Sequence, residues 1–242
     1  FALIDPTILT VGGIVLLVAG MMIVGAFQDA IDEYYVTASA RLLKVVMLTL
    51  GIVLGVSMGL YAARQFGLAF VATPDSLSFT NTTYQYIGAV IISASFALSN
   101  NSRPVGLLIT GASGLLGYYV LLAVSELGLI IIPANAVAGF TVGFTATVVS
   151  RLTRIPSQAI IDAGIVPLVP GLTLYNGLMA LVANPAAADG TLLLMRAVLI
   201  ALAISAGASF GVLIGRPTRR SLVTLRNNLP ERPLRSNQKQ LK

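Results

Sequence analysis

The chain has 242 residues, of which 56% are hydrophobic and only 10% are charged, a composition typical of a polytopic helical membrane protein. It contains no Cys, which excludes disulfides and thiolate chemistry, and no His, the main residue of many catalytic and zinc sites. We therefore expect no enzyme activity, no metal and no cofactor.

The net charge of +6 comes from the C-terminal end of the chain. Residues 216–242 hold eight Lys or Arg against one acidic residue, Glu231. Such a tail is typical of a cytoplasmic extension that follows the positive-inside rule, and this places the C-terminus in the cytoplasm. Nucleic-acid binding is the alternative that we do not favour, and contact with anionic lipid is compatible with both.

Apolar runs of about 20 residues, the length that crosses about 30 Å of hydrocarbon, predict membrane-spanning helices. The first run covers residues 8–27 and the second covers 42–63, with the polar segment 28–40 between them. At helical spacing, Asp29 and Glu33 of this segment share one face. We interpret the segment either as an interfacial connecting helix or as a cavity mouth that contains Asp29.

Five further runs predict a total of about seven spans: 84–98, 105–124, 127–150, 155–183 and 191–215. The fourth span contains TGASGLLG at 110–117, whose glycine spacing resembles a nucleotide-binding fingerprint. That fingerprint needs a preceding strand, and this segment lies inside one apolar run, so we predict close helix packing instead. In the fifth span, a kink at Pro133 and a buried amide at Asn135 are expected to coincide.

The sixth span is the unusual one, because IPSQAIIDAGIVPLVPGLTLYNG at 155–177 combines a carboxylate with a helix break. Pro167 and Pro170 lack a backbone donor, and with Gly171 they should interrupt the helix near mid-span. Irregular backbone in a membrane is tolerated where protein buries it or where it lines a wet cavity, and the ionisable Asp162 favours the cavity. The stretch therefore predicts a transport site.

The side chains near this break supply candidate binding groups. Asp162 is expected to bind a substrate ammonium or to carry a coupling proton, and the alternative is a structural pair with Arg154. Three side chains beyond the break are candidates for hydrogen bonds to a substrate hydroxyl, with ordinary packing as the alternative for each: Thr173, Tyr175 and Asn176. Asn135 is a further candidate of the same kind.

Two parts of the chain match each other in sequence. GIVLLVAGMMIVGA at 13–26 aligns with GIVPLVPGLTLYNG at 164–177, so that Gly20 matches Gly171. In the spans that follow, three glycines spaced by four match three others: Gly51, Gly55 and Gly59 against Gly207, Gly211 and Gly215. The matching spans are five apart along the chain. Because successive spans alternate in direction, an odd separation means that the two copies cross the membrane in opposite orientations. We infer a five-helix inverted repeat, a construction of many secondary transporters with a mid-membrane site.

The repeat defines the predicted domain organisation. Residues 1–64 are the last two helices of the first repeat, 65–83 form a loop, 84–215 form the second repeat, and 216–242 form the basic cytoplasmic tail. About three helices of the first repeat are then missing from the N-terminus.

Two segments carry a resemblance to a known family, GAFQDAIDEYYVTASARLL at 25–43 and the stretch at 155–177. The chain resembles the bacterial threonine/serine exporter family, and its most specific motif is Pro-x-x-Pro-Gly at 167–171. The resemblance implies ten spans in two five-helix halves in the bacterial inner membrane. It also implies antiport of small hydroxylated amino acids, threonine and serine, driven by the proton gradient.

The partners implied are the amino-acid substrate, protons, membrane lipids and the missing N-terminal helices of the same protein. Nucleic acid is not expected, and a homo-oligomer is left open. Two functions from other classes also stay open, a non-transporting membrane partner subunit and a channel for small polar solutes.

Overall fold

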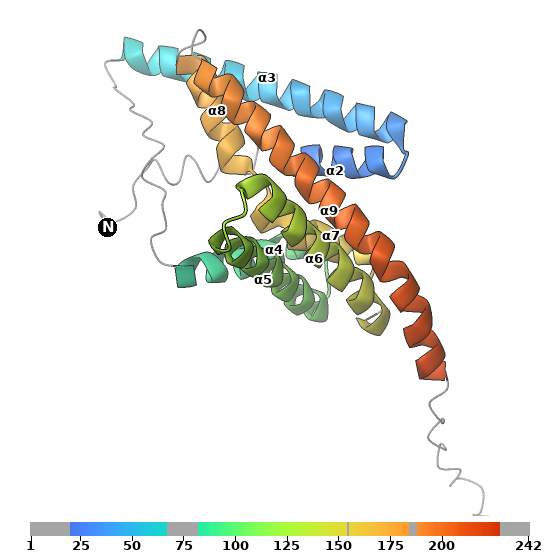
Figure 1. The fold of residues 1–242 in the computed structure, drawn as a ribbon. Helices are drawn as coiled ribbons and strands as arrows, with labels where there is room; N and C mark the ends of the chain where they lie inside the picture. Colours follow the sequence, from blue (N-terminus) through green and yellow to red (C-terminus); the bar gives the residue numbers. More distant parts are fainter. Residues whose placement is uncertain (1–19, 67–81, 154, 184–187, 228–242) are drawn as a thin grey trace, which may run out of the picture.

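The computed structural model describes residues 20–66, 82–153, 155–183 and 188–227 (Figure 1). All regular elements in these ranges are helices. They are, in chain order, α2 (Gly20–Ile31), α3 (Tyr35–Gln65), α4 (Thr82–Ser99), α5 (Pro104–Glu126), α6 (Ile131–Thr153), α7 (Ser157–Ile165), the 3-10 turn η2 (Val166–Leu168), α8 (Gly171–Ala183) and α9 (Ala188–Asn227).

Four of the described helices are long and apolar enough to cross a membrane: α5, α6, the Tyr35–Ile52 part of α3 and the Ala188–Arg216 part of α9. Ser157–Leu168 and Gly171–Leu181, bent by 50°, make a fifth if they form one broken span. The chain is therefore a polytopic helical membrane protein. The predicted total of seven spans is not established, because much of the first span lies outside the described residues and α4, with its polar first turn, is not among the candidates.

The α6–α9 pair forms the most extensive helix contact of the described fold. Gly139 and Gly143 of α6 lie against the α9 backbone, and a Cβ at Gly139 would lie 2.5 Å from the Ile204 carbonyl oxygen. Gly207 and Gly211 of α9 lie in the same way against the α6 backbone. Small residues at four-residue spacing thus let the two backbones touch, which is a main source of helix association in membranes.

The glycine-rich segment of α5 also packs closely, as its sequence predicts. A Cβ at Gly111 would lie 3.3 Å from Val90 of α4, and one at Gly117 would lie 2.7 Å from Val142 of α6. The prediction that TGASGLLG serves close helix packing is confirmed.

The α2–α3 hairpin differs from the predicted polar helix over 28–40. Helix α2 ends at Ile31, Glu33 has a left-handed φ of 68°, and α3 begins at Tyr35. A helix of L-residues cannot continue through that conformation, so the chain turns back on itself. The prediction that Asp29 and Glu33 share one helix face is wrong.

A further prediction, the interruption of the fifth span at Pro133, is wrong. Pro133 lies in the first turn of α6, where backbone N–H groups have no partner within the helix, so it causes no interruption there. Helix α9 continues to Asn227, so residues 216–227 of the predicted tail are helical, while the part of α9 that could span a membrane ends at Arg216, next to the predicted end at 215. The buried position predicted for Asn135 is confirmed, since its side chain is only 2% exposed.

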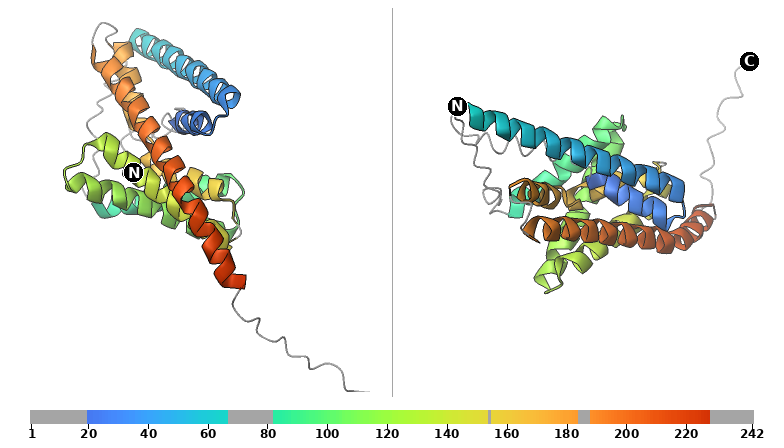
Figure 2. Two further views of the ribbon diagram at one scale, coloured as in Figure 1. Left: turned by 45° about the vertical axis from the view of Figure 1, so that its right-hand side comes forward. Right: turned by 90° about the horizontal axis from the view of Figure 1, so that it is seen from above.

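Helix α3 lies on the outer side of the described structure, away from α4, α5 and α6 (Figure 2). Its main neighbours are α2 and α8, whereas α9 contacts α2, α6 and α8. A Cβ at Gly51, Gly55 or Gly59 of α3 would meet nothing within 4 Å. The glycine row of α3 is therefore open, while the matching row of α9 is covered by α6.

Candidate functional site

The broken helix has its interruption at the predicted residues. Pro167 and Pro170 have no backbone N–H, so the helical hydrogen-bond ladder fails at both positions. Val169 N–H donates instead to the Val166 carbonyl at 3.2 Å, and Gly171 N–H donates to the Val169 carbonyl at 2.8 Å. The chain leaves α7 through η2 and enters α8 at an angle of 50°.

Protein surrounds the break on several sides. On α7, a Cβ at Gly164 would meet Ser113 of α5 and lie 2.9 Å from Val142 of α6. On the α2 side, a Cβ at Gly20 would lie 3.9 Å from the Cα of Gly171. Irregular backbone inside a membrane needs this kind of enclosure, because lipid offers no hydrogen-bond partners.

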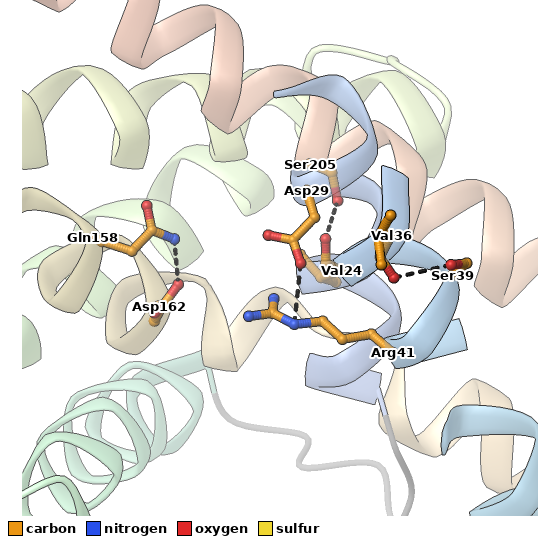
Figure 3. Close-up of polar contacts among 8 residues, drawn as sticks. All are labelled: Val24, Asp29, Val36, Ser39, Arg41, Gln158, Asp162 and Ser205. Carbon is orange, nitrogen blue, oxygen red and sulfur yellow. Dashed lines mark hydrogen bonds and ion pairs between the residues drawn. The ribbon is translucent and has the colours of Figure 1, made fainter. Parts of the chain in front are cut away.

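Asp162 lies on α7, about one turn before the break, with its side chain half-buried. Gln158 Nε2 donates to Asp162 Oδ1 at 2.8 Å, across one turn of the same helix (Figure 3). The alternative partner proposed from the sequence, Arg154, lies outside the described residues.

A second carboxylate, Asp29 of α2, lies in an ion pair with Arg41 of α3. Arg41 Nε is 3.1 Å from Asp29 Oδ2, and the two side chains are 47% and 18% exposed. The contact lacks hydrogen-bond geometry, so Asp29 Oδ2 is buried without a hydrogen bond. Arg41 crosses α2 over Gly25, where a Cβ would lie 2.6 Å from Arg41 Nη1.

These side chains form one charged cluster, which we define as Asp29, Arg41 and Asp162. In Figure 3 the guanidinium of Arg41 lies between Asp29 and Asp162, with its terminal nitrogens on the side of Asp162. Arg41 and Asp29 are also the charged groups that interact electrostatically with Asp162 in the described part of the chain. The cluster therefore joins the α2–α3 hairpin to the broken helix.

A cavity of about 560 Å³ lies beside this cluster, between α2, α6, α7 and α9. Its volume is within the range of small-molecule sites, and it is lined by both polar and apolar residues. The polar and charged lining residues include Gln28, Asp32, Gln158, Ser209 and Arg216. Gln158 connects the cavity to the cluster, because its side chain lines the cavity and donates a hydrogen bond to Asp162.

The predicted site residues do not themselves line this cavity. Asp162 reaches it through Gln158, and Asp29 is one residue from Gln28, which lines it. On α8, Tyr175 is buried, and Thr173 and Asn176 are half-buried.

Two of the predicted amide side chains keep an unused acceptor. The Oδ1 atoms of Asn135 and Asn176 are buried without a hydrogen bond, while Asn135 Nδ2 donates to the Ile131 carbonyl at 2.7 Å. Buried acceptors of this kind usually have partners, so both are available to a bound ligand or water.

Sequence reasoning missed Arg41 and Gln158 as site residues. Gln158 has a local signal, since it precedes Asp162 by four residues and therefore shares its helix face. Arg41 has none, because its position relative to Asp162 depends on the tertiary arrangement of the hairpin and α7.

Apolar helices around a proline-broken helix, beside a charged cluster and a cavity with both polar and apolar lining, are typical of membrane transporters. The family described as "Threonine/Serine exporter, ThrE" matches residues 85–214, and the one described as "Putative threonine/serine exporter" matches residues 1–62. The chain belongs to the threonine/serine exporter family, which is a family of transporters and not of enzymes.

Two curated bacterial relatives are similar over most of this chain. A probable threonine/serine exporter of Mycobacterium tuberculosis is 32% identical over 222 residues, which cover 89% of this chain and 42% of that protein. A threonine/serine exporter of Corynebacterium glutamicum is 32% identical over 223 residues, which cover 90% of this chain and 44% of that protein. The chain thus spans less than half the length of either relative. No solved structure matches it.

Proposed function

We propose that this chain is part of a secondary active transporter that exports threonine and serine across the bacterial inner membrane in exchange for protons. The family and the names of the two relatives support the substrate class. The observation that carries the mechanism is the placement of Asp162, one turn before the helix break and hydrogen-bonded to Gln158 of the cavity wall.

The cavity is the proposed entry for the amino acid. With the C-terminus in the cytoplasm, the end of the cavity at Arg216 faces the side from which an exporter loads. A zwitterion needs one anionic and one cationic partner, and Asp32 and Arg216 are both in the lining. The mixed lining suits serine or threonine better than a large apolar substrate.

The broken helix is the proposed deeper site. Half-helix ends present backbone groups and dipoles that stabilise the carboxylate and the ammonium of an amino acid. The candidates for a hydrogen bond to the substrate hydroxyl are Thr173, Tyr175 and Asn176 of α8, with Asn135 of α6 as a further candidate. The buried and unpaired Oδ1 atoms of the two Asn residues support this role.

Asp162 is the proposed coupling group. Carboxylates within membrane segments that face the protein interior typically belong to substrate or proton pathways. In our scheme, the substrate ammonium binds the ionised Asp162 on the cytoplasmic side, and a proton replaces it after export. The proton then leaves Asp162 toward the cytoplasm before the next ammonium binds.

The proposed architecture is an inverted repeat, in which residues 1–64 end a first five-helix unit and 84–215 form the second. The close approach of Gly20 to Gly171 supports it, because equivalent residues meet at a two-fold axis. The separate family matches to residues 1–62 and 85–214 support the division. The open glycine row of α3 supports a missing helix that corresponds to α6.

Efflux of labelled amino acids from vesicles that contain the complete transporter tests the proposal. We expect efflux of serine and threonine that accelerates when the outside is made acidic, and little efflux of large apolar amino acids. Efflux that does not respond to the proton gradient would favour a channel. A chain that supports no efflux in any assembled form would favour a non-transporting partner subunit.

A further inference from the structure

Arg41 is placed to interact with two carboxylates on different structural elements. Asp29 belongs to α2 of the hairpin, and Asp162 belongs to α7 of the broken helix. We propose that Arg41 is a positioning residue that moves between Asp29 and Asp162 as Asp162 loses and gains a cationic partner. This inference rests on the proposed function, and it adds a residue that couples the hairpin to the broken helix.

The ion pair between Arg41 and Asp29 is made at the Nε atom of the guanidinium. Nε lies 3.1 Å from Asp29 Oδ2, and this contact lacks hydrogen-bond geometry. A strong arginine–carboxylate pair is usually bidentate, with two parallel N–H donors. The Nη groups lie on the side of Asp162 (Figure 3), and the missing Cβ of Gly25 leaves room for Nη1.

The net charge of the cluster explains why a single cation, Arg41, can pair with either Asp29 or Asp162. Asp29, Arg41 and an ionised Asp162 sum to one negative charge, which is costly to keep within a membrane protein interior. One proton on Asp162, or one ammonium beside it, makes the cluster neutral. The cluster therefore holds either a proton or a substrate ammonium, as an antiporter requires.

The position of Arg41 follows from this balance. When Asp162 carries a proton or an ammonium, Arg41 pairs with Asp29, as in the present structure. When Asp162 is ionised and empty, the Nη groups of Arg41 move to it. Arg41 belongs to the hairpin, and Asp162 belongs to α7. The hairpin is therefore drawn toward α7 only in the state in which Asp162 is ionised and empty and Arg41 pairs with it.

The test is a pH titration of Asp162 in the purified complete transporter in lipid. The infrared band of the protonated Asp162 carboxyl group reports its protonation, and the pH at half intensity is the titration midpoint. The band is assigned by its loss in Asp162→Asn. Removing Asp29 leaves Arg41 with Asp162 alone, which favours the ionised carboxylate, so Asp29→Asn should move the titration midpoint down by about one pH unit. Removing the cation has the opposite effect, so Arg41→Gln should move the midpoint up by about one unit.

Two controls separate this role from a structural one. Arg41→Lys keeps the charge and should leave the midpoint near that of the wild type. Arg196→Gln removes an exposed arginine of α9 outside the cluster and should leave the midpoint unchanged. Unchanged midpoints, or shifts of Asp29→Asn and Arg41→Gln in the same direction, would overturn the inference. Because the readout is not transport, failure of proton-driven export would be detected separately.

Discussion

At the scale of single residues, Asp162 and Asp189 offer a matched comparison. Asp162 is half-buried on α7 and hydrogen-bonded to Gln158, whereas Asp189 is exposed in the first turn of α9. Both are aspartates, so a general effect of removing a carboxyl group should be the same for the two.

We expect Asp162→Asn to lower proton-driven efflux of serine at least about tenfold, equivalent to about 1.4 kcal/mol in the transport barrier. Amide and carboxylate have nearly the same shape, but an amide cannot bind a proton or pair with an ammonium. Asp189→Asn should transport like the wild type. Initial rates of labelled serine efflux at several external pH values measure both. Wild-type rates and pH dependence in Asp162→Asn would contradict the role given to Asp162.

At the scale of secondary-structure elements, the two prolines of the broken helix separate a transport role from a scaffold role. We expect Pro167→Ala with Pro170→Ala to restore part of the helical ladder and to reduce the bend of 50° between α7 and α8. A straighter helix loses the free backbone groups of the site. Efflux should therefore fall at least about tenfold while the protein still assembles in the membrane.

Size-exclusion chromatography measures whether the double variant still assembles. It therefore separates a loss of transport from a loss of folding. Pro133→Ala is a suitable control, because Pro133 lies in the first turn of α6, where a proline costs little. Full transport by the double variant would favour the partner-subunit function.

The same elements show what local sequence can predict. The break at Pro167 and Pro170 and the close packing of TGASGLLG were predictable, because a missing N–H or a missing side chain acts at its own position. The end of α2 was not, since Glu33 is a non-glycine residue with a left-handed φ and carries no sequence signal for it. The contact of Arg41 with the other helices was hidden for a different reason, because it depends on tertiary packing.

At the scale of the whole molecule, the open glycine row of α3 bears on how much of the transporter this chain represents. The corresponding row of α9 is covered by α6, and both curated relatives are more than twice as long as the matched region. On the proposed inverted repeat, we therefore expect the row of α3 to pack against a further helix of the complete transporter.

Gly55→Leu tests this expectation, with Gly88→Leu of α4 as its control. A Cβ meets open space at both positions in the described structure, so neither substitution should disturb the fold seen here. If a helix covers α3, the leucine at Gly55 separates two backbones and costs about 1–3 kcal/mol of assembly. Co-purification of the complete transporter and its efflux measure the effect. Equal behaviour of the two variants would show that the α3 row faces lipid.

The central claim is that export of the amino acid and entry of a proton are one coupled process at Asp162. The most direct measurement records both in the same vesicles, with labelled serine for efflux and a pH-sensitive dye for proton movement, when no proton gradient is imposed. We predict that an outward serine gradient drives protons inward in the wild type and drives none in Asp162→Asn. Serine efflux without proton movement in the wild type would contradict the claim.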